Sequence, residues 1–167
     1  MSGGRQREQD NTMKNKTVKK TSVFPAGRHE VFYRLQKLST LQDVAWPYAT
    51  FTPTDGTEDM TWESGVTSSY RFRLFGLIPF GIHTIHVIRF SEEEGIYTHE
   101  GNQHVPVWNH EIILKDLSEE TCEYTDRVEI GAGWKTIFVY LWACCFYAHR
   151  QRKWIRMLKR SGNPKKL

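Results

Sequence analysis

Five side chains able to carry charge or form hydrogen bonds lie in segments that otherwise alternate between apolar and polar residues: Tyr70, His86, Glu100, His110 and Asp126. A histidine beside a carboxylate suits general acid–base catalysis, because the carboxylate fixes the imidazole tautomer and tunes its pKa toward neutrality. The same groups would also orient a ligand in an apolar pocket, or would satisfy one another as a buried polar network. All three roles are open for these candidates.

Strand parity predicts which of these side chains meet. Side chains alternate between the two faces of a sheet, and residues of neighbouring strands that share a face lie opposite one another. Pairing Phe90 with Ile96 across an acidic turn places His86 opposite Glu100. A similar register across the preceding turn places Tyr70 opposite His86. We therefore expect a polar band across an apolar inner face.

His110 and Asp126 each lie at an even residue number in their strand, where the neighbouring side chains of the same face are apolar. An odd-length turn between the two strands puts them opposite or diagonal to each other. The predicted ligand-binding residues on strands and last helix are Tyr70, Phe72, His86, Ile88, Glu100, Trp108, His110, Tyr124, Asp126, Phe138, Leu141 and Trp142. His86 and His110 are the candidates for a catalytic base. Two histidines and a carboxylate could ligate a metal, but no His-x-Glu or Cys-x-x-Cys spacing supports this. We expect neither a metal nor a cofactor.

Alternation, helical spacing and turn residues predict the elements that position these side chains. We expect an edge strand at 16–24, a helix at 28–38 and a short helix ending at 44, with strands at 48–52, 66–75, 82–90, 96–102, 107–114 and 122–130. The glycine- and proline-containing segment 76–81 is expected to be a hairpin loop. Residues 134–159 contain no Pro or Gly and predict one long helix, with 149–154 as its solvated basic end.

Length and composition favour one domain. A chain of 167 residues with 39% apolar residues can bury one full core. We expect a disordered arm at 1–15, a single domain at 16–160 and a basic tail at 161–167. The net charge of +4 comes from basic clusters near both ends, without a nucleic-acid-binding motif. We therefore expect no nucleic-acid partner, and a monomer or homodimer.

Cysteine usage and hydropathy predict the compartment. Cys122, Cys144 and Cys145 are odd in number and lack metal-ligand spacing, which fits a reducing environment. The first residues lack the apolar core of a secretory signal. The longest apolar run, 137–148, is shorter than the ~20 residues that span a bilayer. The expected location is the cytoplasm, with no membrane span.

Particular stretches resemble a known superfamily. They are Phe24-Pro25-Ala26 with Val31-Phe32, Leu41 with Pro47, Trp62-Glu63-Ser64-Gly65, the segment 74–81 and the segment 149–154. Together with the order of the elements, they resemble the SRPBCC superfamily of START domains, polyketide cyclases and birch-pollen allergens, in particular its uncharacterised bacterial ligand-binding branch. The similarity covers about residues 16–160.

The resemblance implies an α+β helix-grip fold, in which a curved antiparallel sheet of about seven strands wraps around a long C-terminal helix. It also implies a hydrophobic cavity between sheet and helix. The expected function is binding of a small, largely hydrophobic molecule that is lipid-, polyketide- or aromatic-like. A cyclase- or dehydratase-like enzyme in the same pocket and a non-catalytic protein-interaction module are the alternatives.

Overall fold

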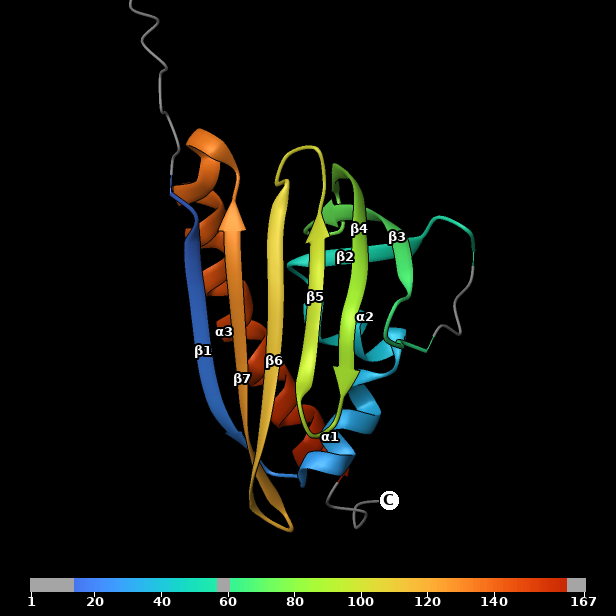
Figure 1. The fold of residues 1–167 in the computed structure, drawn as a ribbon, viewed down its shortest axis with the longest axis vertical. Helices are drawn as coiled ribbons and strands as arrows, with labels where there is room; N and C mark the ends of the chain where they lie inside the picture. Colours follow the sequence, from blue (N-terminus) through green and yellow to red (C-terminus); the bar gives the residue numbers. More distant parts are fainter. Residues whose placement is uncertain (1–13, 57–60, 162–167) are drawn as a thin grey trace, which may run out of the picture.

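The computed structural model describes residues 14–56 and 61–161. Its elements are β1 Lys16–Phe24, α1 Arg28–Leu35, α2 Leu38–Ala45, β2 Ala49–Pro53, β3 Thr67–Leu74, β4 Ile78–Ser91, β5 Gly95–Gly101, β6 Val107–Ser118, β7 Thr121–Gly131, a 3₁₀ turn Gly133–Lys135 and α3 Thr136–Ser161 (Figure 1). The predicted order of strands and helices is confirmed. Residues 1–13 of the predicted arm and 162–167 of the predicted tail lie outside the described residues.

One antiparallel sheet contains all of these strands, in the order β1-β7-β6-β5-β4-β3-β2. Figure 1 shows that the sheet curves, and that α3 runs behind β1, β7 and β6 while α1 and α2 lie behind the other side of the sheet. β1 forms one edge, as predicted for 16–24, and β2 forms the other. The predicted helix-grip architecture, a curved sheet around a long C-terminal helix, is therefore confirmed.

α3 packs one face against the sheet because its buried residues recur three or four positions apart. These residues are Thr136, Ala143, Phe146, Tyr147, Arg150, Gln151, Trp154 and Leu158. The prediction that 149–154 is a solvated helix end is wrong, because this buried face continues through Arg150, Gln151 and Trp154. Neither α3 nor any other helix in the described part of the chain has the length and hydropathy needed to cross a membrane.

A bulge in β4 changes the faces to which its residues point. Val87 pairs with Thr98 and Arg89 pairs with Tyr97, so Ile88 is an extra residue without a partner on β5. One extra residue reverses the alternation on one side of the bulge relative to the other. The sequence pattern alone did not indicate this irregularity.

The bulge overturns the predicted orientation of His86 and Ile88. Phe90 pairs with Ile96 as expected, yet His86 lies opposite His99, and Glu100 lies opposite Ile85. β3 is also shifted relative to the prediction, because Tyr70 lies opposite His83 rather than His86.

The residues of β4 that face the interior are instead His83, Ile85 and Val87, which are all buried. Ile88 is 43% exposed, and His86 lies within 2.6 Å of the Thr67 hydroxyl on the outer face. The predicted inward orientation of His86 and Ile88 is therefore wrong.

Three element boundaries differ from the prediction for local reasons. The helix expected at 28–38 ends at Leu35, because Lys37 adopts an extended backbone (φ −99°, ψ 129°) before α2. The hairpin expected at 76–81 is a tighter turn at Phe75 and Gly76, which both have positive φ, and β4 already begins at Ile78. β6 also continues beyond the expected residue 114, as far as Ser118.

Candidate functional site

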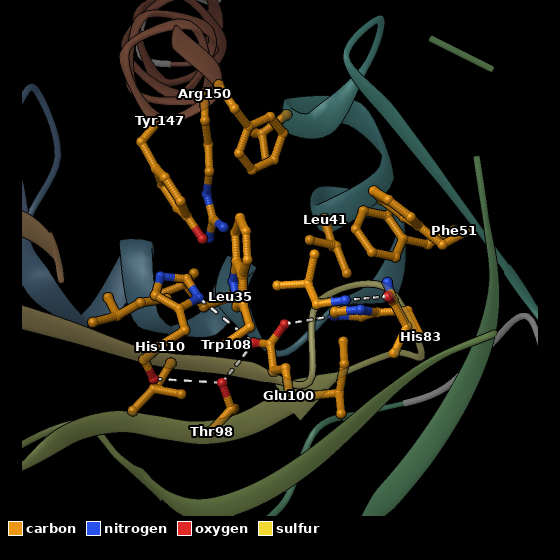
Figure 2. Close-up of a pocket in the computed structure, with 18 of the residues that line it drawn as sticks. Leu35, Leu41, Phe51, His83, Thr98, Glu100, Trp108, His110, Tyr147 and Arg150 are labelled. Carbon is orange, nitrogen blue, oxygen red and sulfur yellow. Dashed lines mark hydrogen bonds and ion pairs between the residues drawn. The ribbon is translucent and has the colours of Figure 1, made fainter. Parts of the chain in front are cut away.

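A cavity of about 310 Å³ lies between the curved sheet and α3 (Figure 2). Its walls come from α1, α2, β2 to β6 and α3, and they are mostly apolar. The aromatic residues that line it are Phe51, Trp62, Phe72, Phe80, Phe90, Trp108, Phe138, Trp142, Phe146, Tyr147 and Trp154. The volume is at the lower end of the ~300–1,000 Å³ typical of ligand pockets.

Polar groups gather on the sheet side of this cavity. His83 Nε2 on β4 lies 2.9 Å from Glu100 Oε2 on β5. The hydroxyl of Thr98 donates to Glu100 Oε1 over 2.6 Å. The three side chains all line the cavity, and Figure 2 shows them side by side on the strands below α3.

His110 on β6 connects this group to a second carboxylate. Its Nδ1 lies 3.7 Å from Glu100 Oε1, and its Nε2 lies 2.8 Å from Asp126 Oδ1 on β7. In the sheet His110 is directly opposite Val128, so its contact with Asp126 is diagonal. The structure thus brings His110, Glu100 and Asp126 into one buried network.

Asp126 is completely buried and its two oxygens are well satisfied. Oδ1 also accepts a hydrogen bond from the Tyr124 hydroxyl over 3.1 Å, and Oδ2 accepts one from Gln151 Nε2 over 2.9 Å. Gln151 is held in turn by Ser22, whose hydroxyl donates to Gln151 Oε1 over 2.7 Å. Asp126 therefore anchors α3 to the sheet beneath the cavity wall.

The network shifts the pKa values of its members. Burial alone would raise the pKa of Glu100, but His110 and His83 together lower it well below its ordinary range. Burial likewise opposes ionisation of Asp126, yet the Arg150 charge and the hydrogen bond from His110 lower its pKa. Burial would lower the pKa of His110, and the contacts with Asp126 and Glu100 raise it instead. The two carboxylates therefore favour the protonated form of His110 more than water would.

His83 lines the cavity, and one of its two ring nitrogens has no hydrogen-bond partner among the described residues. Ionised Glu100 only accepts hydrogen bonds, so His83 Nε2 must carry a proton. Among the described residues, His83 Nδ1 is buried without a partner. A His–carboxylate pair with one open nitrogen can accept or deliver a proton, or can form a hydrogen bond with a polar ligand group.

Arg150 reaches the cavity from the opposite wall. It lines the cavity with only 5% of its surface exposed, and Figure 2 shows its side chain extending from α3 toward Trp108 and the polar groups of the sheet. Its Nη2 donates to the Tyr124 hydroxyl over 3.2 Å, and its guanidinium lies 5.7 Å from the centre of the Tyr147 ring.

The predicted binding residues divide into those that line the cavity and those that do not. Phe72, Glu100, Trp108, His110, Phe138 and Trp142 line it. Tyr70, Tyr124 and Asp126 are buried outside the lining, and burial raises the pKa of Tyr70 to about 12. Leu141 is 55% exposed, and His86 and Ile88 are on the outer face, as described above. Whether the lining residues bind a ligand remains a prediction.

Sequence reasoning missed His83, Thr98 and Arg150. The alternation that points His86 inward points His83 outward, and the bulge at Ile88 leaves no clear trace in that alternation. Arg150 was assigned to the solvated end of the last helix. A usable signal existed for Arg150, because it lies three residues after Tyr147 and four before Trp154, on the buried face of α3.

Neither a metal cluster nor a disulfide is present in the part of the chain that the structure describes. No three His, Cys, Asp or Glu side chains among those residues are placed to hold a metal ion. The cysteines are free thiols, with Cys122 buried, Cys144 half-buried and Cys145 exposed.

Solved structures with low sequence identity share this fold. The Zhui aromatase/cyclase from Streptomyces superposes with a TM-score of 0.70 at 11% identity, covering 90% of this chain and 98% of that one. Norcoclaurine synthase from Thalictrum flavum, in complex with dopamine and hydroxybenzaldehyde, gives 0.64 at 10% identity, covering 96% and 95%. A START superfamily protein from Mycobacterium smegmatis gives 0.61 at 13% identity, covering 86% and 97%.

At such identities these similarities establish the fold, which is that of the SRPBCC superfamily. No curated protein sequence matches the chain. A family model described as "Domain of unknown function (DUF8410)" matches residues 22–158, most of the described chain. The protein therefore belongs to the DUF8410 family and has the helix-grip fold of the SRPBCC superfamily.

Proposed function

We propose that the protein binds a small, largely apolar molecule in the cavity between the sheet and α3. The observation that carries this proposal is the cavity itself, with about 310 Å³ of space behind mostly apolar walls. Protein interiors are close-packed, and voids larger than a water molecule are few. A space of this size bounded by side chains from eight elements is better suited to a ligand than to a passive packing defect.

The chemistry of the walls supports a ligand with an aromatic or aliphatic body. Aromatic side chains contribute large apolar areas that stabilise a bound ring or chain by burial. The main polar groups converge from two walls, with His83 and Glu100 on the sheet and Arg150 on α3. A few convergent polar groups in an apolar pocket fix the orientation of a small ligand. Two structural relatives are described as an aromatase/cyclase and as a synthase in complex with aromatic compounds.

The direct test is displacement of a neutral fluorophore, N-phenyl-1-naphthylamine, by small aromatic and fatty compounds. Val139 lines the cavity on α3, whereas Ile137 on the same helix is 42% exposed and outside the lining. Val139→Trp would fill part of the cavity, so we expect it to weaken fluorophore binding about ten-fold or more. Ile137→Trp is the matched control and should bind like the wild type.

Far-ultraviolet circular dichroism would establish that both variants are folded. Wild-type protein that gives no displaceable fluorescence would refute the proposal. So would a folded Val139→Trp variant whose affinity equals that of the wild type.

The second candidate function is an acid–base enzyme of cyclase or dehydratase type, and the His83–Glu100 pair favours it. The 2.9 Å contact fixes an imidazole that lines the cavity, and its Nδ1 has no partner among the described residues. His110 is unsuited to be the base, because both its nitrogens face carboxylates. If this function is correct, the wild type should turn over at least one compound in a panel of carbonyl compounds. The turnover rate should fall at least 100-fold in His83→Ala. Turnover unaffected by His83→Ala would exclude this mechanism.

A further inference from the structure

The unsatisfied polar atoms of the described interior point to the ligand's polar group. Apart from Arg28 Nε, each buried side-chain nitrogen or oxygen without a partner belongs to a residue that lines the cavity: His83 Nδ1, Trp142 Nε1, Arg150 Nε and Trp154 Nε1. Arginine and tryptophan side chains can only donate hydrogen bonds. Three of these four atoms are therefore donors without an acceptor, whereas His83 Nδ1 can accept a hydrogen bond because Nε2 carries the ring proton.

Arg150 is the strongest of these donors. Its guanidinium carries a permanent charge and has five N–H groups in a planar fork. Within the described residues it makes one hydrogen bond, to the neutral hydroxyl of Tyr124. None of the ion pairs among those residues includes Arg150, so no described carboxylate oxygen lies within 4.0 Å of it. Buried charges in proteins are normally paired, since an unpaired one is costly.

The two carboxylates nearest to Arg150 are occupied by other partners. Asp126 accepts from His110, Tyr124 and Gln151, and it interacts with the Arg150 charge without a direct hydrogen bond to it. Glu100 accepts from His83 and Thr98 on the sheet. The fork of Arg150, a residue that lines the cavity, therefore retains N–H groups without a hydrogen-bond partner among the described residues.

We propose that the cavity is selective for apolar acids, meaning small molecules with an aromatic or aliphatic body and one carboxylate that pairs with the guanidinium of Arg150. A carboxylate matches the fork because its two oxygens can accept two parallel hydrogen bonds. Trp154 lies one helical turn after Arg150 on the same face of α3 and offers a further donor nearby. This inference rests on the proposed function and specifies the class of ligand.

The test compares matched pairs of competitors that differ only in the polar group. Decanoic acid and decan-1-ol, and 2-naphthoic acid and 2-naphthalenemethanol, would each displace N-phenyl-1-naphthylamine at pH 7.5, where both acids are ionised. In the wild type we expect each acid to bind about ten-fold or more tightly than its alcohol, because hydrogen bonds to charged groups are the strong ones. Equal affinities of acid and alcohol would overturn the proposal.

Arg150→Met removes the charge and the donors but keeps an unbranched apolar side chain. It should abolish the preference for acids, measured within the variant as the ratio of the affinity for each acid to that for its matched alcohol. Arg152→Met is the matched control, because Arg152 is exposed on the same helix and caps only the Ala148 carbonyl. This control should retain the full preference for acids.

Arg150→Lys keeps the charge without the fork and should show an intermediate preference for acids. It is the decisive variant if Arg150→Met does not fold. An acid preference that persists in a folded Arg150→Met or equals wild type in Arg150→Lys would refute the role of the fork. Fluorophore binding without an acid preference refutes only this inference. Absence of fluorophore binding refutes the proposed function itself.

Discussion

His110 lies between two buried carboxylates, so its charge determines how stable that part of the interior is. Burial opposes its protonation, but Asp126 and Glu100 raise its pKa above the ordinary value of 6.5. A group whose pKa is raised by folding stabilises the folded state when it is protonated. This contribution is complete below about pH 6.5 and is lost as the pH rises through the folded-state pKa.

We therefore expect His110→Gln to lower the free energy of unfolding by about 3–5 kcal/mol at pH 6, because it leaves buried carboxylates without their cation. The deficit should shrink at pH 9, where the wild type has lost part of the same stabilisation. Urea unfolding at both pH values measures this difference. His99→Gln, at an exposed histidine on β5, is the control and should change stability by less than about 0.5 kcal/mol. A deficit that grows with pH would contradict the assignment.

Individual site residues were predictable where parity held. His110 and Asp126 were expected to be opposite or diagonal, and they form a 2.8 Å contact. Glu100 was expected beside a histidine of β4, but its partner is His83 instead of His86. The residue types of the polar group were therefore evident from the sequence, whereas the identity of one member depended on backbone geometry that residue types do not encode.

At the scale of elements, β4 explains this error. The parity of Ile82, Ile88 and Phe90 and the parity of Ile85 and Val87 are almost equally apolar, so composition does not choose between them. The bulge at Ile88 lets both Val87 and Phe90 line the cavity, although continuous alternation would place them on opposite faces. A bulge reverses which residues of a strand point inward. A search for one continuous alternation of apolar and polar residues therefore does not detect it.

Because of the bulge, we expect the same type of substitution to affect stability very differently at two adjacent apolar residues, Val87 and Ile88. Val87 is completely buried and Ile88 is 43% exposed. Val87→Thr should lower the free energy of unfolding by about 1–3 kcal/mol, because it places a hydroxyl in an apolar environment. Ile88→Thr should change it by about 0.5 kcal/mol or less. Urea denaturation of the two variants measures both values, and a larger effect at Ile88 would contradict the register of β4.

α3 is the second element that differs from the prediction, because more of its length is buried against the sheet than its sequence indicated. Its sequence indicated a long helix with an apolar first half and a basic second half. In the structure the buried face crosses that boundary, and it carries Tyr147, Arg150 and Trp154 into the cavity wall. Charge content suggested solvent exposure, but helical spacing from Ala143 onward is what determines burial here. A basic segment within a helix is therefore better judged by its position around the axis than by its charge.

At the scale of the whole molecule, the order of the elements was the most predictable property. Long alternating strands, short turns and one uninterrupted terminal helix leave few arrangements, and the antiparallel sheet follows from the short connections. The cavity was expected from the family resemblance, not from composition. Aromatic residues fill a core and line a hollow equally well, so only the packed coordinates distinguish the two.

The placement of the tryptophans has an optical consequence. Trp62, Trp108, Trp142 and Trp154 form part of the cavity wall, whereas Trp46 and Trp134 are 50% and 70% exposed. An apolar ligand beside an indole displaces water and changes the polarity around the ring, and tryptophan fluorescence depends on that polarity. Intrinsic emission from the four wall indoles will therefore report occupancy without any added dye, over a constant, red-shifted background from the two at the surface.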